Sequence, residues 1–278
     1  MKSHAALAPR GEVIFAICEK KTVISEHFIP EHMLAHIYSG SVSIAEAEKT
    51  HTFTEGDTLL LKRNLLAKFV NYPASNAPFK LMLITFDQHT LHDFYIEQKA
   101  AKQVKNTAFA PIGPIKSIAR HPELNSLFNS LLPYYELNHT LSEELLTLKF
   151  REAITILRKI DSTSDAVLSD FSEPGKIDLV AFMNKHYSFN IPAKRFAYLT
   201  GRSLATFKRD FQKSFHTSPE KWLRQTRLER AHFLIREIGK RPSEVYLEVG
   251  FETFSHFSFA FKKWFGYSPS ESLSRYNS

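Results

Sequence analysis

The chain has 278 residues, enough for two domains with their own cores, and its 43% hydrophobic and 23% charged content excludes extensive disorder. Cys18 is the single cysteine, which excludes an intramolecular disulfide and fits a reducing compartment. No apolar run approaches the roughly 18 to 20 residues of a membrane span, and the first residues lack a signal-peptide core. We therefore expect a cytoplasmic protein with no membrane partner.

The net charge of +7 is concentrated in the last third of the chain. From Lys176 to Ser278 there are 18 Lys and Arg against 9 Asp and Glu, whereas residues 1–175 hold 18 against 20. A basic module beside a nearly neutral region is the usual electrostatic pattern of a nucleic-acid-binding protein. Charge alone also allows a basic surface that only contacts solvent.

Residues 13–86 are typical of short strands. The segments are β-branched or alternate in polarity, and Ser-Gly, Glu-Gly-Asp and Asn-Tyr-Pro turns separate them. The expected strands are VIFAIC (13–18), TVISEHF (22–28), MLAHIYSG (33–40), SVSIAEA (41–47), HTFTEG (51–56), DTLLLK (57–62) and FKLMLITF (79–86). Strands at this spacing predict a small antiparallel barrel or sandwich.

The sequence offers little for metal or catalytic chemistry. His27, His32 and His36 lie near one another, but residues 62–64, after the Glu-Gly-Asp turn, are Lys-Arg-Asn and supply no further histidine ligand. We expect turn, strand and core roles for these histidines and no metal. Because no Ser/His/Asp or Cys/His arrangement and no phosphate-binding glycine loop is evident, we expect neither an enzyme nor a cofactor.

Helical periodicity begins after the strands. Ser126–Tyr135 and Ser142–Ile160 are expected helices, and 161–175 is a polar segment with Pro-Gly that is expected to be a linker. The second helix carries an apolar seam near heptad spacing. Its members are Leu146, Phe150, Ala153, Leu157 and Ile160. This seam either packs on the strands or mediates homodimerisation, and the sequence leaves both readings open.

From residue 177 onward the pattern is helical throughout. Prolines 192, 219 and 242 stand at expected helix starts, and Gly201, Gly239 and Gly250 stand at expected ends. Ser203 is an expected N-cap. A helix, a short turn containing glycine and a second helix occur twice, at 192–215 and 242–265. This is the layout of a helix-turn-helix, whose second helix enters the DNA major groove.

The two helix pairs are related by an internal repeat. FKRDFQKSFHTSP (207–219) aligns without a gap with FSFAFKKWFGYSP (257–269). Aromatic residues at spacing four lie on one helical face, so we expect them to form the core. They are Phe207, Phe211, Phe215, Phe257, Phe261 and Phe265. The connecting helix of roughly twenty residues spans about 30 Å, close to the ~34 Å between successive major-groove segments.

The outward faces then hold the expected DNA contacts. The base-reading candidates are Leu204, Ala205, Lys208 and Arg209 in the first copy, and Phe254, Ser255, Ser258 and Phe259 in the second. Arg209 is suited to guanine and Leu204 or Ala205 to a thymine methyl. The phosphate candidates are Ser203, Lys213 and Lys262. The two outward phenylalanines either read thymine methyls, pack on the N-terminal domain or cover a neighbouring loop.

TGRSLATFKRDFQKSFHTSPEKWLRQTRLERA (200–231) and VYLEVGFETFSHFSFAFKKWFGYSP (245–269) resemble the two halves of an AraC/XylS-family DNA-binding domain, over roughly 176–276. The resemblance assigns Ala205, Lys208, Arg209 and the four candidates of the second copy to base-reading positions. Phe259 stands where the family often has arginine, so we rank the first copy as the main source of specificity.

The resemblance implies an α+β two-domain fold. We expect a cupin-like antiparallel β-barrel sensor at 1–105, a helical dimerisation or packing segment at 106–160 and the linker at 161–175. An all-α DNA-binding domain with both helix-turn-helix units follows at 176–278.

The implied function is that of a sequence-specific transcription regulator that binds double-stranded DNA and RNA polymerase. It would act as a homodimer under a small-molecule or protein effector of unknown identity. The sequence leaves open whether it activates or represses. The alternatives are a nonspecific architectural DNA binder and a cupin-type enzyme fused to a DNA-binding tail.

Overall fold

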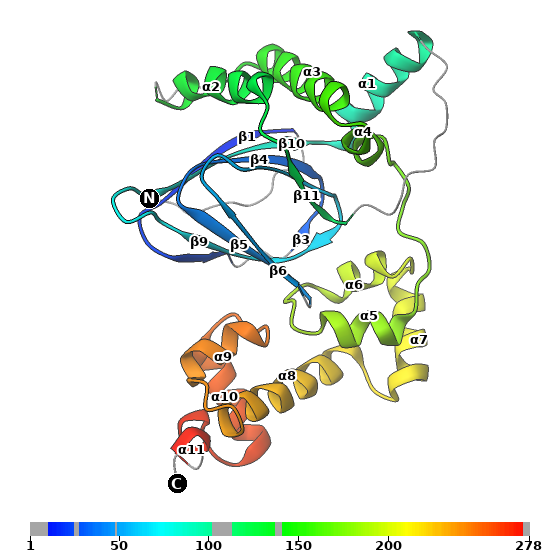
Figure 1. The fold of residues 1–278 in the computed structure, drawn as a ribbon. Coiled ribbons are helices and arrows are strands. Elements are labelled where there is room, and N and C mark those ends of the chain that lie inside the picture. The colour runs from blue at the N-terminus through cyan, green and yellow to red at the C-terminus, as the bar shows by residue number, and fades with distance from the viewer. Residues whose placement is uncertain (1–10, 25–27, 48, 102–112, 137–140, 275–278) are drawn as a thin grey trace. The chain divides into compact units, whose positions relative to one another are not determined.

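The computed structural model of the chain describes residues 11–24, 28–47, 49–101, 113–136 and 141–274. The chain divides into two compact units, and the boundary between their main segments lies between Ser172 and Glu173. Sheets covered by helices make up the first unit and helices alone the second, which confirms the α+β two-domain class (Figure 1). No helix in the described ranges is long and apolar enough to cross a membrane.

The strands of the first unit form antiparallel sheets. One sheet has the order β1-β10-β4-β7-β11, a second has the order β2-β9-β5-β6, and β3 pairs with β8. Their bounds are β1 Val13–Cys18, β2 Thr22–Ile24, β3 Phe28–Ile29, β4 His32–Ser39, β5 Ser41–Glu46, β6 Lys49–Thr54, β7 Thr58–Leu61, β8 Leu65–Leu66, β9 Lys68–Tyr72, β10 Phe79–Phe86 and β11 Ile115–Ile118. Closure of these sheets into a barrel stays a prediction.

Strand β4 shows how the first unit builds two cores. Successive side chains of a strand point to opposite faces of its sheet. Ala35 and Ile37 are buried in a cluster that also contains Ile44 of the other large sheet. Leu34 is buried in a second cluster, with residues of four helices. The sheet of β4 therefore lies between a core shared with the second sheet and a core shared with helices.

Those helices cover the outer face of the five-stranded sheet (Figure 1). Their bounds are α1 Gln88–Ala101, α2 Pro122–Glu136, α3 Glu143–Ile160 and α4 Ser162–Leu168. The predicted helix at Ser142–Ile160 is confirmed, with Ser142 as its N-cap. Helix α1 and strands β8, β9 and β11 were not expected from the sequence, because short or weakly periodic segments carry little local signal.

The dimerisation reading of the apolar seam on α3 is wrong. Phe150, Ala153 and Leu157 are almost fully buried in the core that α3 shares with the sheet, and Leu146 and Ile160 pack against that same core. Side chains covered by their own chain cannot form a seam with a second copy. The packing alternative is therefore the one that the structure supports.

The linker prediction is also wrong for its first half. Helix α4 occupies Ser162–Leu168 within the segment 161–175. The Asp161 side chain caps it by accepting a hydrogen bond from the Thr163 backbone N–H, and Val167 and Leu168 are buried. A helix of seven residues is too short to show apolar periodicity in sequence, and its stability comes from this cap and its packing.

The strand histidines have structural roles, as expected. His32 is fully buried, and its Nδ1 accepts a hydrogen bond from the Arg63 backbone N–H. Burial lowers the pKa of His32 to about 3, so the ring is neutral at pH 7. His36 contacts the Thr58 hydroxyl through Nδ1 and stacks on Phe128. His27 lies outside the described residues, among which no group of three or more His, Cys, Asp or Glu is placed to hold a metal ion.

The second unit consists of seven helices among the described residues. They are α5 Leu179–His186, α6 Ala193–Leu199, α7 Leu204–Phe215, α8 Pro219–Arg236, α9 Pro242–Glu248, α10 Phe254–Phe265 and α11 Pro269–Ser274. Helices α6 to α10 correspond to the two expected helix pairs and the expected connecting helix, with ends that differ by a few residues. Helices α6 and α7 form the first helix-turn-helix, α9 and α10 form the second, and α8 connects them (Figure 1).

Candidate nucleic-acid interface

The two recognition helices, α7 and α10, begin and end in the same way. The Ser203 hydroxyl accepts a hydrogen bond from the Thr206 backbone N–H, and the Thr253 hydroxyl accepts one from the His256 N–H. These N-caps satisfy donors that the first helical turn leaves free. Each helix has 12 residues and ends at a residue in the left-handed region. The N-cap prediction for Ser203 is confirmed.

The predicted aromatic core is confirmed in both repeats. The first two phenylalanines of each set, at 207 and 211 and at 257 and 261, are fully buried. Phe215 and Phe265, the third of each set, pack on the edges of the same clusters. With this stripe turned inward, the opposite face of each recognition helix is left for contacts outside the unit.

The exposed face of α7 contains the predicted base-reading residues. Ala205 and Lys208 are exposed, the Leu204 side chain is 39% exposed, and the Arg209 side chain is 77% exposed. The phosphate candidate Lys213 is also exposed. The Arg209 side chain is therefore open to contact with a partner.

The exposed face of α10 differs from the prediction in two places. Ser255 and Phe259 are exposed, but Ser258 is half-buried, which limits its access to a base. The Phe254 ring is 40% exposed and makes an edge-on contact with Tyr246 at 5.8 Å between ring centroids, so part of it belongs to the core of the second repeat. Phe259, in contrast, is 69% exposed.

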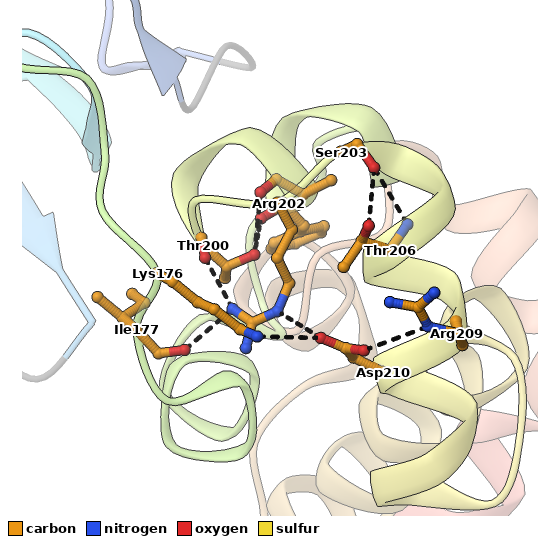
Figure 2. A network of polar contacts seen from close by, with 10 residues as sticks. Lys176, Ile177, Thr200, Arg202, Ser203, Thr206, Arg209 and Asp210 are labelled. Carbon is orange, nitrogen blue, oxygen red and sulfur yellow. Dashed lines mark hydrogen bonds and ion pairs between the residues drawn. The ribbon is translucent and has the colours of Figure 1, made fainter.

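An ion-pair network that sequence reasoning missed holds the turn of the first repeat (Figure 2). The Arg202 guanidinium lies 3.1 Å from Asp210 and donates hydrogen bonds to the carbonyl oxygens of Ile177 and Thr200. Its hydrogen bond lowers the pKa of the Asp210 carboxyl. Lys176 and Arg209 lie at 3.9 and 3.8 Å from that carboxylate. The single acid of α7 is thus neutralised beside the exposed cations.

A second missed residue, Arg227, joins α8 to the loop that precedes the first repeat. Its guanidinium donates hydrogen bonds of 2.8 and 2.9 Å to the carbonyl oxygens of Tyr187 and Phe189. Burial lowers the pKa of Arg227 to about 10, so it stays charged at pH 7. Its position between buried Leu223 and buried Ala231, each four residues away, is the sequence signal that could have found it.

The turn of the second repeat packs against the same loop. Gly250 has φ of +95°, and a Cβ there would lie 2.5 Å from the Ser188 carbonyl oxygen, so only glycine fits this close approach. The Asn190 side-chain amide donates a 2.7 Å hydrogen bond to Glu252. Loop 187–190 therefore contacts both α8 and the second turn, which fixes the two repeats relative to each other.

The electrostatics of the interface favour an anionic partner. Asp210 is the one acidic residue in α7, and α10 contains none. Lys208 and Lys213 of α7 and Lys262 of α10 are exposed, and none of the described contacts pairs them with a carboxylate at ion-pair distance. The two helices have the same kind of N-cap and carry exposed cations and no unpaired carboxylate. They can therefore approach phosphates without like-charge repulsion.

Comparisons with known proteins agree with this geometry. Residues 196–275 match a family model described as a helix-turn-helix domain, and residues 32–167 match the ExsA N-terminal regulatory domain. The chain is 25% identical over 253 residues to the virulence regulon transcriptional activator VirF of Yersinia enterocolitica, covering 87% of this chain and 90% of that protein. It is 31% identical over 107 residues to the HTH-type transcriptional regulator ExsA of Pseudomonas aeruginosa, covering 38% of each.

Among solved structures, a variant of ToxT from Vibrio cholerae in the apo form aligns with this chain over 95% of this chain and 97% of the ToxT chain. Its TM-score is 0.46 and its sequence identity is 14%.

The helix-turn-helix match begins within α6 and ends after α11, so it contains both recognition helices. The regulatory-domain match covers most of the first unit. Both relatives are transcription regulators by name. The chain belongs to the AraC-type family of sequence-specific, DNA-binding transcription regulators.

Proposed function

We propose that the chain activates transcription by inserting α7 and α10 into adjacent major-groove segments on one side of the duplex. The observation that carries this proposal is the matched pair of capped recognition helices with exposed basic faces. Helix α8 has 18 residues and a length of about 27 Å. With the width of the flanking helices, this length suits the ~34 Å spacing of major-groove segments. The name activator for VirF supports activation over repression.

Within this proposal, the first repeat is the main reader of sequence. Arg209 donates two hydrogen bonds to a guanine edge, and Leu204 or Ala205 contacts a thymine methyl. Ser203, Lys213 and Lys262 bind phosphates, which orients the unit without specifying sequence. Ser258 is the weakest base-reading candidate because it is half-buried.

The first unit has the regulatory role in this proposal. Its support is the match of residues 32–167 to a regulatory domain. A small molecule or a partner protein acts on this unit, the DNA-bound unit contacts RNA polymerase, and the chain works as a homodimer in the cytoplasm. Because the seam of α3 is buried, dimerisation uses another surface. Sedimentation equilibrium of the purified chain tests this part, and a monomer at all concentrations would contradict it.

The DNA-binding proposal is tested on duplexes selected from a random pool by the full-length chain. Fluorescence anisotropy compares a selected duplex with its scrambled form at two salt concentrations. Arg209→Ala is expected to cost about 1–3 kcal/mol and to relax preference at one base position. The matched variant Lys213→Ala is expected to weaken binding to all duplexes alike and to reduce the salt slope by about 1.

Two outcomes would contradict the proposal. Equal affinity for selected and scrambled duplexes would indicate a nonspecific architectural binder. Uniform weakening by Arg209→Ala would assign that residue to a phosphate. Metal analysis of the purified chain addresses the remaining alternative, because stoichiometric iron, zinc or manganese would support a cupin-type enzyme.

A further inference from the structure

Phe259 is the most exposed of the large apolar side chains described in the second unit. Its side chain is 69% exposed, whereas Phe257 and Phe261 of the same helix are fully buried. At 100° per residue, Ser255 and Lys262 flank Phe259 on the helix face opposite to the core. Of the three explanations that the sequence allowed for this ring, cover by a neighbouring loop is excluded by its exposure.

An exposed phenylalanine at this position is available for a partner to cover. Burying such a side chain against a partner is favourable because apolar surface leaves water. Lys262 and Lys263 follow on the same helix, which has no acidic residue. The partner must therefore offer an apolar group on an anionic surface. In the DNA major groove, the thymine 5-methyl group is the apolar feature that lies among base edges between phosphates.

The internal repeat places Phe259 at the position that corresponds to Arg209. The two residues share one position of the aligned repeats, and both side chains are mostly exposed. Each also lies two residues after a fully buried phenylalanine, Phe207 or Phe257. The same position of the two recognition helices therefore presents a fork of hydrogen-bond donors in one repeat and an aromatic ring in the other.

We propose that Phe259 packs against a thymine methyl group, so that the second repeat selects thymine at the position where the first repeat selects guanine. This inference rests on the proposed function, because it requires α10 to lie in the major groove. It assigns the second repeat a specificity of its own, carried by apolar contact and not by hydrogen bonds.

The test removes single methyl groups from the DNA. Every thymine in a duplex selected by the full-length chain is replaced in turn by deoxyuridine, which pairs identically but lacks the 5-methyl group. We expect one replacement to weaken DNA binding by the wild-type chain about fourfold, which is the contribution of one buried methyl-sized group. The same replacement should leave DNA binding by Phe259→Ala unchanged. It should still weaken DNA binding by Phe259→Leu and by Arg209→Ala.

The outcomes distinguish a failure of this inference from a failure of the proposed function. One outcome is that the chain binds the selected duplex specifically while no deoxyuridine replacement weakens binding by wild type more than binding by Phe259→Ala. In that case the methyl contact is wrong and the proposed function stands. If selection yields no preferred sequence, both fail. If Phe259→Ala binds every duplex like wild type but loses activation of a reporter, Phe259 contacts a protein and the inference is overturned. Because the ring is exposed, thermal melting should match wild type.

Discussion

The two helix-turn-helix repeats share a framework but differ in the chemistry of their turns and exposed faces. Both have a 12-residue recognition helix, a hydroxyl N-cap and a buried aromatic stripe at spacing four. The aligned positions that differ most are the turn before the helix and the middle of the exposed face. The framework therefore requires the caps and the stripe, while the other positions are free to carry different contacts.

The turns illustrate this freedom. In the first repeat, Arg202 and Asp210 form a 3.1 Å ion pair that holds the turn. In the second repeat, the positions of these residues hold Glu252 and Ala260, and no such pair is possible. There, the buried Phe251 ring makes an edge-on contact with Phe257 at 5.3 Å between centroids. One turn is held by charge and the other by apolar packing.

Helix α8 provides a second contrast. Near its start, Trp222 packs on Phe215 at 4.7 Å between ring centroids. Near its end, His232 stacks on Phe265 at 4.6 Å, and its Nε2 lies 2.8 Å from the Tyr267 hydroxyl. Trp222 and His232 each cover the last phenylalanine of a recognition helix, but the ring that covers the second repeat can be protonated.

The largest expected effect tests whether the two cores are equivalent. Phe211→Ala and Phe261→Ala should each lower the free energy of unfolding of the second unit by about 3–5 kcal/mol, because both rings are fully buried. Both tryptophans of the chain lie in this unit, so urea unfolding followed by tryptophan fluorescence reports on it. Exposed Phe259→Ala is the control, with an effect within about 0.5 kcal/mol. A small loss for only one core variant would show that the repeats are not equivalent.

A smaller effect tests the two kinds of turn. Arg202→Ala should cost about 2 kcal/mol, since its side chain is 7% exposed and its hydrogen bonds to Asp210 and two carbonyl groups are lost. The matched variant Glu252→Ala changes the same position of the second repeat and removes only an exposed hydrogen bond from Asn190, so it should cost about 0.5–1 kcal/mol. The same fluorescence assay measures both. Equal losses would mean that the ion pair does not distinguish the turns.

The smallest effect is a pH dependence confined to the second repeat. Burial lowers the pKa of His232 below its ordinary value of 6.5, so the unfolded chain binds this proton more readily than the folded chain. The resulting stability is complete above pH 6.5 and declines as the pH falls through that value. His232→Phe should remove this part of the decline between pH 8 and pH 5.5 in urea unfolding. An unchanged pH dependence in the variant would disprove the assignment.

Much of the second unit was predictable because its signals are local. Prolines near helix starts, the hydroxyl cap at Ser203 and phenylalanines at spacing four act within a few residues of each other. These features predicted the helices, the buried face and, by elimination, the exposed positions that include Arg209 and Phe259. The alternation of β4 likewise predicted a strand with two faces.

The remaining features depend on contacts between distant segments. Periodicity showed that α3 has an apolar seam, but only the fold showed that the chain's own sheet covers it. The roles of Arg202 and Arg227 depend on a carboxylate and on loop carbonyl groups that only the folded chain brings beside them. The sequence by itself thus determined which faces are apolar and which helices form, since these depend on local spacing. The tertiary structure decided what covers each face and which charges are buried, because those energies come from residues far apart in the chain.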